Sequence, residues 1–266
     1  MNRPTLDPVV NAAVTAFEQV VQPLVFETGI AEFPLGIWGS VFMIGHRGRC
    51  FIVTARHSLR PDSLRPICIP AGDASPDLLP LKDAWFVPVG RLLDDDSTDF
   101  VLVEVDRKRL HRRHGQSRLL NLDQHSLDWI EHRDTSQFLL IGFPEERCAI
   151  HYDKDLIDAQ RTILAGRYAR QERAMGAGVF SMTIDDTLGM QSFSGFSGGP
   201  VMCWVRRLGL QPQLVFCGIA IRGTPASGLV YFIGAGTLYN AVEVWGSPPL
   251  HPKGITRPAE GPRHQG

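Results

Sequence analysis

The segment Gln191–Pro200 (QSFSGFSGGP) constrains this chain more than any other. It holds Ser197 between Gly195 and the pair Gly198-Gly199. Glycine adopts positive φ angles at little cost and lets the backbone approach other groups closely, so the pattern predicts a sharp turn that presents the serine hydroxyl. The N–H groups of Gly195 and Ser197 would then be available to a developing oxyanion. A serine is a weak nucleophile by itself, so this interpretation requires a base elsewhere in the chain.

The best candidate for that base is His57, at the end of a predicted β-hairpin. Residues 41–44 and 50–54 are rich in β-branched and aromatic side chains, and residues 45–48 (GHRG) indicate the turn between them. His57 follows the second of these strands, in the sequence Thr-Ala-Arg-His. The pattern therefore places an imidazole just beyond a strand end.

An acid that could orient this histidine opens a second apolar strand. Asp99 precedes Phe-Val-Leu-Val-Glu-Val, in which the alternate valines would share one face. A carboxylate at the mouth of such a strand can accept the Nδ1 proton of His57 and fix the histidine tautomer. Asp94, Asp95 and Asp96 lie in the same loop and remain alternatives to Asp99 in this role.

Taken together, these segments resemble the three landmarks of the trypsin/chymotrypsin-fold serine peptidases. The segments are Thr-Ala-Arg-His57, Asp99-Phe-Val-Leu-Val and Gly195-Phe-Ser-Gly-Gly-Pro200, and their chain order of His, Asp, Ser is that of the family. The resemblance implies an all-β fold of two antiparallel six-stranded β-barrels, with a His57-Asp99-Ser197 triad between them. It also implies an oxyanion hole formed by Gly195 and Ser197, and it implies no cofactor.

Three positions depart from the secreted, digestive members of the family. Phe196 stands where those enzymes have an aspartate that pairs with the newly cut N-terminus during zymogen activation. Arg56 replaces the usual alanine before the histidine, and Ser58 replaces a cysteine that often forms a disulfide there. The chain is therefore more similar to the non-digestive bacterial members of the family.

Family resemblance also indicates where a substrate would bind. Gln191 stands at the floor of the primary specificity pocket, and because it is not an acid a preference for Lys or Arg is disfavoured. The segment Cys217–Gly223 resembles the strand that pairs with the substrate backbone, here through Ile221, Arg222 and Gly223. The Arg222 side chain would either attract an acidic substrate side chain or point to solvent.

Composition narrows the class of protein. The 266 residues are 44% hydrophobic with a formal net charge of −1, which gives no general attraction to nucleic acid or to an acidic membrane. The 19 prolines and 26 glycines divide many short β-rich runs and so favour an all-β class over a helical one. Five cysteines without a CxxC pair favour reduced thiols and a cytoplasmic location. No apolar run is long enough to span a membrane, and the N-terminus does not resemble a secretory signal.

The chain divides into four predicted regions. Residues 1–30 form an N-terminal extension with an amphipathic helix over residues 8–22, which would either pack on the first barrel or dock a partner. Residues 31–129 form the first barrel and residues 130–246 the second. A short helix spans residues 238–245 within the second region. The tail, residues 247–266, is rich in Pro, Gly and charge and is predicted to be disordered.

A serine endopeptidase with a polypeptide substrate is the function that this sequence favours. The main alternative is a catalytically latent or inactive peptidase-fold module for binding or sensing, which an activating protein partner could switch on. An acyl-transferring esterase is a weaker third option. The α/β-hydrolase elbow Gly-x-Ser-x-Gly is also matched at residues 195–199, but that fold places its histidine after the serine, where only His251 and His264 stand.

Overall fold

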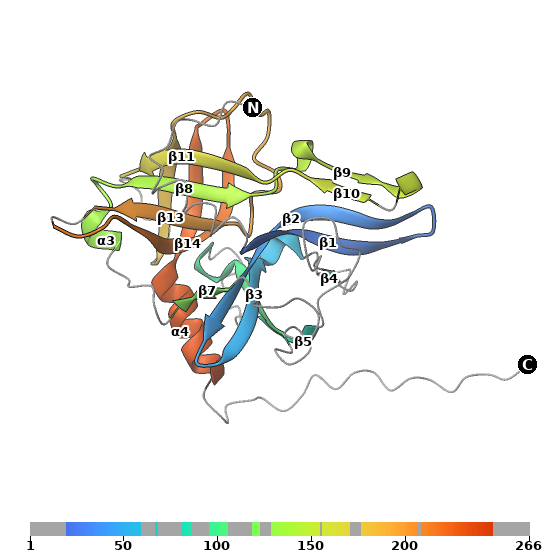
Figure 1. Ribbon diagram of the computed structural model, residues 1–266, viewed down its shortest axis with the longest axis horizontal. Helices are drawn as coiled ribbons and strands as arrows, with labels where there is room; N and C mark the ends of the chain where they lie inside the picture. Colours follow the sequence, from blue (N-terminus) through green and yellow to red (C-terminus); the bar gives the residue numbers. More distant parts are fainter. Residues whose placement is uncertain are drawn as a thin grey trace, which may run out of the picture.

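The fold is built almost entirely from antiparallel β-strands arranged as an open sheet packed against a closed barrel (Figure 1). The open sheet comes from the first half of the chain and the barrel from the second half. This computed structural model describes residues 20–59, 67–68, 81–86, 96–105, 119–122, 129–154, 156–170, 177–206 and 209–246.

The open sheet has the strand order β4-β1-β2-β3-β6-β5, with each neighbouring pair antiparallel and β7 added in parallel to β2. A two-residue turn at Arg47 and Gly48 joins β2 to β3, and both residues have positive φ angles of 45° and 77°. Such a turn matches the right-handed twist of the flanking strands. The strands of the open sheet are β1 (Val21–Ile30), β2 (Phe33–His46), β3 (Arg49–Ala55), β4 (Ile67–Cys68), β5 (Leu81–Phe86), β6 (Phe100–Val105) and β7 (Leu120–Asn121).

Both faces of this sheet are apolar because hydrophobic residues occupy successive positions along the strands. On β6, Val101, Val103 and Val105 point to one face and pack in one cluster with Leu24 of β1. Phe100 and Leu102 point to the opposite face, toward the barrel. The strand period of two residues therefore produces two separate packing layers.

The barrel closes through the strand order β11-β12-β15-β14-β13-β8. Its interior is aromatic: Trp129 lies 4.9 Å from Phe180 and 5.7 Å from Phe232 between ring centroids. Closure pairs every strand of the ring with two neighbours along part of its length. The six strands are β8 (Gln137–Gly142), β11 (Thr162–Tyr168), β12 (Val179–Ile184), β13 (Pro200–Val205), β14 (Gln213–Thr224) and β15 (Leu229–Gly234).

The sheet and the barrel share one hydrophobic interface. At its centre the Phe42 ring of β2 meets the Phe216 ring of β14 edge to face, with centroids 5.5 Å apart. Helix α4 (Ala235–Gly246) follows β15 and spans the same boundary, because Glu243 pairs with Arg47 at 2.7 Å and with His46 at 3.0 Å. The two units are thus held in a fixed relation around the region between them.

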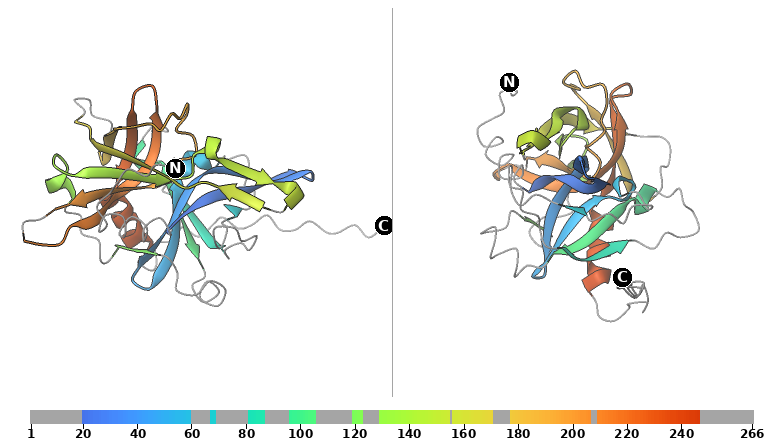
Figure 2. Two further views of the ribbon diagram at one scale, coloured as in Figure 1. Left: turned by 45° about the horizontal axis from the view of Figure 1, so that its top comes forward. Right: turned by 90° about the vertical axis from the view of Figure 1, so that its right-hand side faces the viewer.

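The remaining elements are short. A second hairpin, β9 (Cys148–His151) and β10 (Leu156–Ala159), extends beside the long β1–β2 hairpin (Figure 2). The other short elements are α3 (Trp129–His132) and the single-turn helices η1 (Arg56–Ser58), η2 (Asp96–Thr98), η4 (Glu145–Arg147) and η5 (Tyr152–Lys154). Within the residues described, no helix has the length and apolar character needed to cross a membrane.

The predicted fold is confirmed at the coarse level: the chain is mostly β, has a closed six-stranded antiparallel barrel and carries a short C-terminal helix. The helix spans residues 235–246 instead of the predicted 238–245. The first unit differs from the expected barrel, because among the described strands β4 and β5 stand at opposite edges of an open sheet.

The predicted N-terminal extension is wrong at its C-terminal end. Residues 21–30 form β1, which pairs with β2 and so belongs to the first sheet. The segment from Val20 to Val25, with Gln22 in it, is buried without a gap because both faces of the sheet are covered there. Val20 and Val21 also continued the apolar stripe of the predicted helix, and a short apolar pair does not distinguish a strand from a helix. The rest of that helix and the tail 247–266 lie outside the described residues.

Candidate active site

His57 and Asp99 are brought together by two neighbouring strands. β3 and β6 pair with Ala55 opposite Phe100, so the residues just beyond these ends lie side by side. The Asp99 carboxylate accepts two hydrogen bonds from His57, one from the backbone N–H at 2.9 Å and one from Nδ1 at 2.6 Å. Nδ1 therefore carries a proton, and the neutral ring keeps its lone pair on Nε2.

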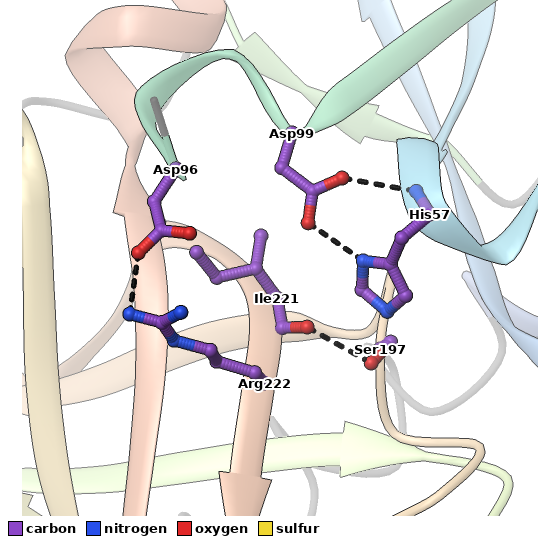
Figure 3. A network of polar contacts seen from close by, with 6 residues as sticks. All are labelled: His57, Asp96, Asp99, Ser197, Ile221 and Arg222. Carbon is purple, nitrogen blue, oxygen red and sulfur yellow. Dashed lines mark hydrogen bonds and ion pairs between the residues drawn. The ribbon is translucent and has the colours of Figure 1, made fainter. Parts of the chain in front are cut away.

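The other nitrogen of the His57 ring points toward Ser197 (Figure 3). Ser197 lies in the loop between β12 and β13, and its hydroxyl donates a hydrogen bond of 3.1 Å to the backbone oxygen of Ile221. A rotation of the hydroxyl would redirect this proton toward Nε2. The arrangement can accordingly pass a proton from a serine to a histidine that a carboxylate holds in one tautomer.

The peptide groups around Ser197 are fixed by their carbonyl oxygens. The oxygen of Ser194 accepts from the N–H of Glu145 at 2.9 Å, and that of Phe196 accepts from the N–H of Gly199 at 2.8 Å. In a trans peptide the N–H points opposite to the C=O. The N–H of Gly195 therefore points away from the contact made by the Ser194 oxygen, and the N–H of Ser197 points away from that made by the Phe196 oxygen. Neither N–H has a protein acceptor within the described part of the chain.

The glycines of this loop are required by space as well as by conformation. Gly195 and Gly198 have φ angles of +93° and +87°. A Cβ at Gly195 would lie 2.3 Å from the oxygen of Phe143, and one at Gly198 would lie 2.0 Å from the oxygen of Ser40. The loop therefore packs directly on the backbone of both structural units.

Phe196 anchors the same loop in the barrel core. Its side chain is only 2% exposed and meets the Phe193 ring edge to face, with centroids 6.1 Å apart. Phe196 stands where the resemblance to digestive peptidases would place an aspartate, and apolar burial holds it there. A buried phenylalanine contributes about 2 kcal/mol or more to the order of such a segment.

The four predicted substrate-binding residues lie around β14 and the loop before Ser197. Gln191 is exposed in that loop, the Ile221 side chain is buried in the hydrophobic interface between sheet and barrel, and Gly223 continues the strand. Arg222 pairs with Asp96 of η2 at 2.5 Å and lies over the Tyr231 ring, and its side chain is half exposed. Figure 3 shows this ion pair beside the His57–Asp99 pair.

Asp96 is consequently not the residue that orients His57, although it was one of the alternatives to Asp99. Its carboxylate lies one turn before Asp99 and faces Arg222 across the boundary between sheet and barrel. Asp94 and Asp95 lie outside the described residues. The pairing of Asp96 with Arg222 had no sequence signal, since the two residues are far apart in the chain.

The cysteines add no cross-link to the described structure. Cys50, Cys148, Cys203 and Cys217 are all unbridged. Partial burial raises the pKa of the Cys148 thiol to about 11, and full burial raises the pKa of Cys217 well above its usual value. Thiols in such surroundings are poor nucleophiles near neutral pH.

Comparison with known proteins adds no relative. No protein-family model matches the sequence, and no curated protein matches it.

Proposed function

We propose that this protein is a serine endopeptidase with the fold and mechanism of the trypsin-like family. The observation that carries the proposal is the pair of hydrogen bonds that His57 donates to the Asp99 carboxylate, with the other ring nitrogen directed at Ser197. Two hydrogen bonds to one carboxylate define both the ring orientation and the tautomer. The double-barrel architecture of that family is part of the proposal, and the open sheet around β1–β6 is its first unit.

In the proposed reaction Ser197 Oγ attacks the scissile carbonyl carbon while its proton moves to His57 Nε2. Asp99 stabilises the imidazolium that forms. The carbonyl oxygen becomes an oxyanion, which accepts hydrogen bonds from the N–H groups of Gly195 and Ser197. His57 then gives its proton to the leaving amine, and a water molecule, activated by the same histidine, releases the acyl group and restores Ser197. The chemistry requires no cofactor.

The open edge of β14 supports a polypeptide substrate. β14 pairs with β13 only up to Ile219, whereas its pairing with β15 continues to Thr224. From Ile221 onward, no described strand covers the side of β14 that faces Ser197. An extended peptide could add to this edge through backbone hydrogen bonds, which would bring its carbonyl group to the serine.

A catalytically latent module is the second candidate, and one observation favours it. The Ser197 hydroxyl donates to Ile221 and not to His57, so the proton-transfer step needs a prior rotation. If a bound chain displaces the hydroxyl from the Ile221 oxygen, activity would depend on that ligand or on a protein partner. The unbridged cysteines of the described part are consistent with a cytoplasmic location for either candidate.

Labelling with a fluorophosphonate probe tests the proposed function. The probe should modify wild-type protein stoichiometrically at Ser197, located by mass spectrometry, and should leave the Ser197→Ala variant unmodified. Ser192→Ala is the matched control, because Ser192 is an exposed serine of the same loop and its removal should leave labelling unchanged. A folded wild-type protein that takes up no label would refute an assembled hydrolase site.

A further inference from the structure

Ser40 is a buried polar residue of the first sheet that touches the Ser197 loop at two points. It lies on β2 with no exposed surface. Its backbone N–H donates to the oxygen of Ser197 at 2.9 Å, and its hydroxyl donates to the oxygen of Gly195 at 2.6 Å. Ser40 thus holds, through their carbonyl oxygens, the same two residues whose N–H groups have no acceptor within the described part of the chain.

The Ser40 hydroxyl also joins this loop to the barrel. It accepts a hydrogen bond of 2.8 Å from the N–H of Phe143, which directly follows β8. Its own backbone oxygen accepts from the hydroxyl of Thr54 on β3 at 2.9 Å. One side chain thus connects β2, the end of β8 and the loop, and Thr54 ties its backbone to the strand that leads to His57.

The space around this hydroxyl is closely filled. A Cβ built at Gly142 would lie 2.8 Å from Ser40 Oγ and 2.8 Å from the Phe196 ring, which shows how closely the space is filled. Without the hydroxyl, the Gly195 oxygen and the Phe143 N–H would each lose a partner in a buried place. An unsatisfied buried polar group is costly, so the Gly195–Phe196 peptide would turn to find another partner. Such a turn changes the ψ angle of Gly195 and the φ angle of Phe196, and these two angles set the direction of the Gly195 N–H relative to the Ser197 N–H.

We propose that Ser40 is a positioning residue: its hydroxyl, supplied by the first sheet, holds the Gly195–Phe196 peptide, which lies between the two donor peptides, and so fixes the direction of the Gly195 and Ser197 N–H groups relative to each other. The catalytic consequence rests on the proposed peptidase function, whereas the structural consequence does not. Oxyanion stabilisation depends on the direction of these donors, and a misplacement of about 1 Å in such a site can cost about 10²-fold in rate. Order in the loop of the second unit accordingly depends on a side chain from the first.

Two measurements on Ser40→Ala test the proposal, with Ser181→Ala as the matched control. Ser181 is also a buried serine, 2% exposed, whose hydroxyl donates to a backbone oxygen, that of Ala169 on the barrel at 3.1 Å. Hydrogen exchange is followed by mass spectrometry on peptides covering residues 191–200. In Ser40→Ala the amides of Phe196, Gly198 and Gly199 should exchange at least about tenfold faster than in wild type, and in Ser181→Ala at the wild-type rate.

The second measurement is the rate of labelling by the fluorophosphonate, per mole of folded protein. Ser40→Ala should label about 10²-fold more slowly than wild type, with kcat for a peptide substrate lowered and KM little changed. Ser181→Ala should keep the wild-type values. If Ser40→Ala does not fold, Ser40→Cys replaces it, because a thiol fills the site but is a weaker donor.

The two measurements separate the two proposals. Unchanged exchange in the loop of a folded Ser40 variant overturns the positioning role, whether or not the protein is an enzyme. Wild-type protein that fails to label refutes the peptidase proposal alone, and faster exchange in Ser40→Ala would still support the positioning role. A wild type and a Ser40→Ala variant that label equally fast refute the positioning role and leave the peptidase proposal standing.

Discussion

Replacement of Asp99 by asparagine is the most informative single change at the candidate site. The carboxylate accepts both from the backbone N–H of His57 and from Nδ1. Asparagine has only one acceptor oxygen and replaces the other with an NH₂ donor. The backbone N–H of His57 can only donate, so the oxygen of the asparagine side chain must face it. The NH₂ group then faces Nδ1.

This geometry forces the wrong histidine tautomer. Two N–H groups cannot face each other, so the Nδ1 proton must move to Nε2, which can then no longer accept the proton of Ser197. The resulting loss in turnover is expected to be about 10⁴-fold, as is typical of this substitution in such triads. That factor corresponds to about 5 kcal/mol of transition-state stabilisation, whereas the fold should stay intact because the side-chain shape is unchanged.

The assay compares the rate of fluorophosphonate labelling and of peptide hydrolysis in Asp99→Asn with those of Asp96→Asn. The latter is a matched control, since Asp96 comes from the same acidic segment but pairs with Arg222. It should keep its labelling rate to within about tenfold, because its partner is not part of the proton-transfer path. An Asp99→Asn variant that retains rates near those of wild type would show that Asp99 does not set the tautomer, and the argument from these two hydrogen bonds would fail.

Three further results are expected. Gly198→Ala should lower the free energy of unfolding by about 3 kcal/mol or more, because a Cβ there meets the backbone. Gly189→Ala is the control: Gly189 has a φ of +73° and nothing within 4 Å of its Cβ position, so this change should cost only about 1 kcal/mol. Denaturant titrations that give equal losses for the two variants would contradict the packing argument. Alkylation of Cys148 by iodoacetamide should be slow at pH 8 and should accelerate with pH until about 11, and a plateau near pH 8 would mean that burial does not raise its pKa. A double-mutant cycle on Asp96 and Arg222 should give a coupling energy of no more than about 1 kcal/mol, since the side chains are 23% and 51% exposed, and a larger value would show that the pair is better shielded than its exposure indicates.

The parts of the fold that could be predicted are those governed by local pattern. Alternating valines and a tight turn placed the β2–β3 hairpin and β6, and the Gly-rich segment placed a sharp turn at Ser197. β1 was missed because its first residue, Val21, also continued the apolar stripe of the helix predicted over residues 8–22, and a short apolar run does not distinguish a strand from a helix. The open edges of the first sheet could not be predicted either, since strand pairing between distant segments leaves no local signal.

The same division applies to the candidate site. His57, Asp99 and Ser197 each stand in a short motif, so the sequence alone could name them. Ser40 had no such signal: a serine within a strand is usually a surface residue, and only the tertiary structure shows that its hydroxyl is buried between β2 and the loop. The contact between Ser40 and the Ser197 loop depends on how the open sheet meets the barrel, which no local sequence pattern records.

The way in which this loop is held has a consequence for regulation. In the digestive peptidases that the motifs resemble, the corresponding loop is ordered by an ion pair between an aspartate and a free N-terminus, which forms only after cleavage and which depends on charge. Here the same region is held by burial of Phe196 and by hydrogen bonds from the neutral hydroxyl and backbone of Ser40. Neither contact requires a cut chain, and neither contains a group that titrates near neutral pH. Control of a peptidase built in this way would therefore have to act on access to the β14 edge or on the direction of the Ser197 hydroxyl, because the loop itself offers no charge to switch.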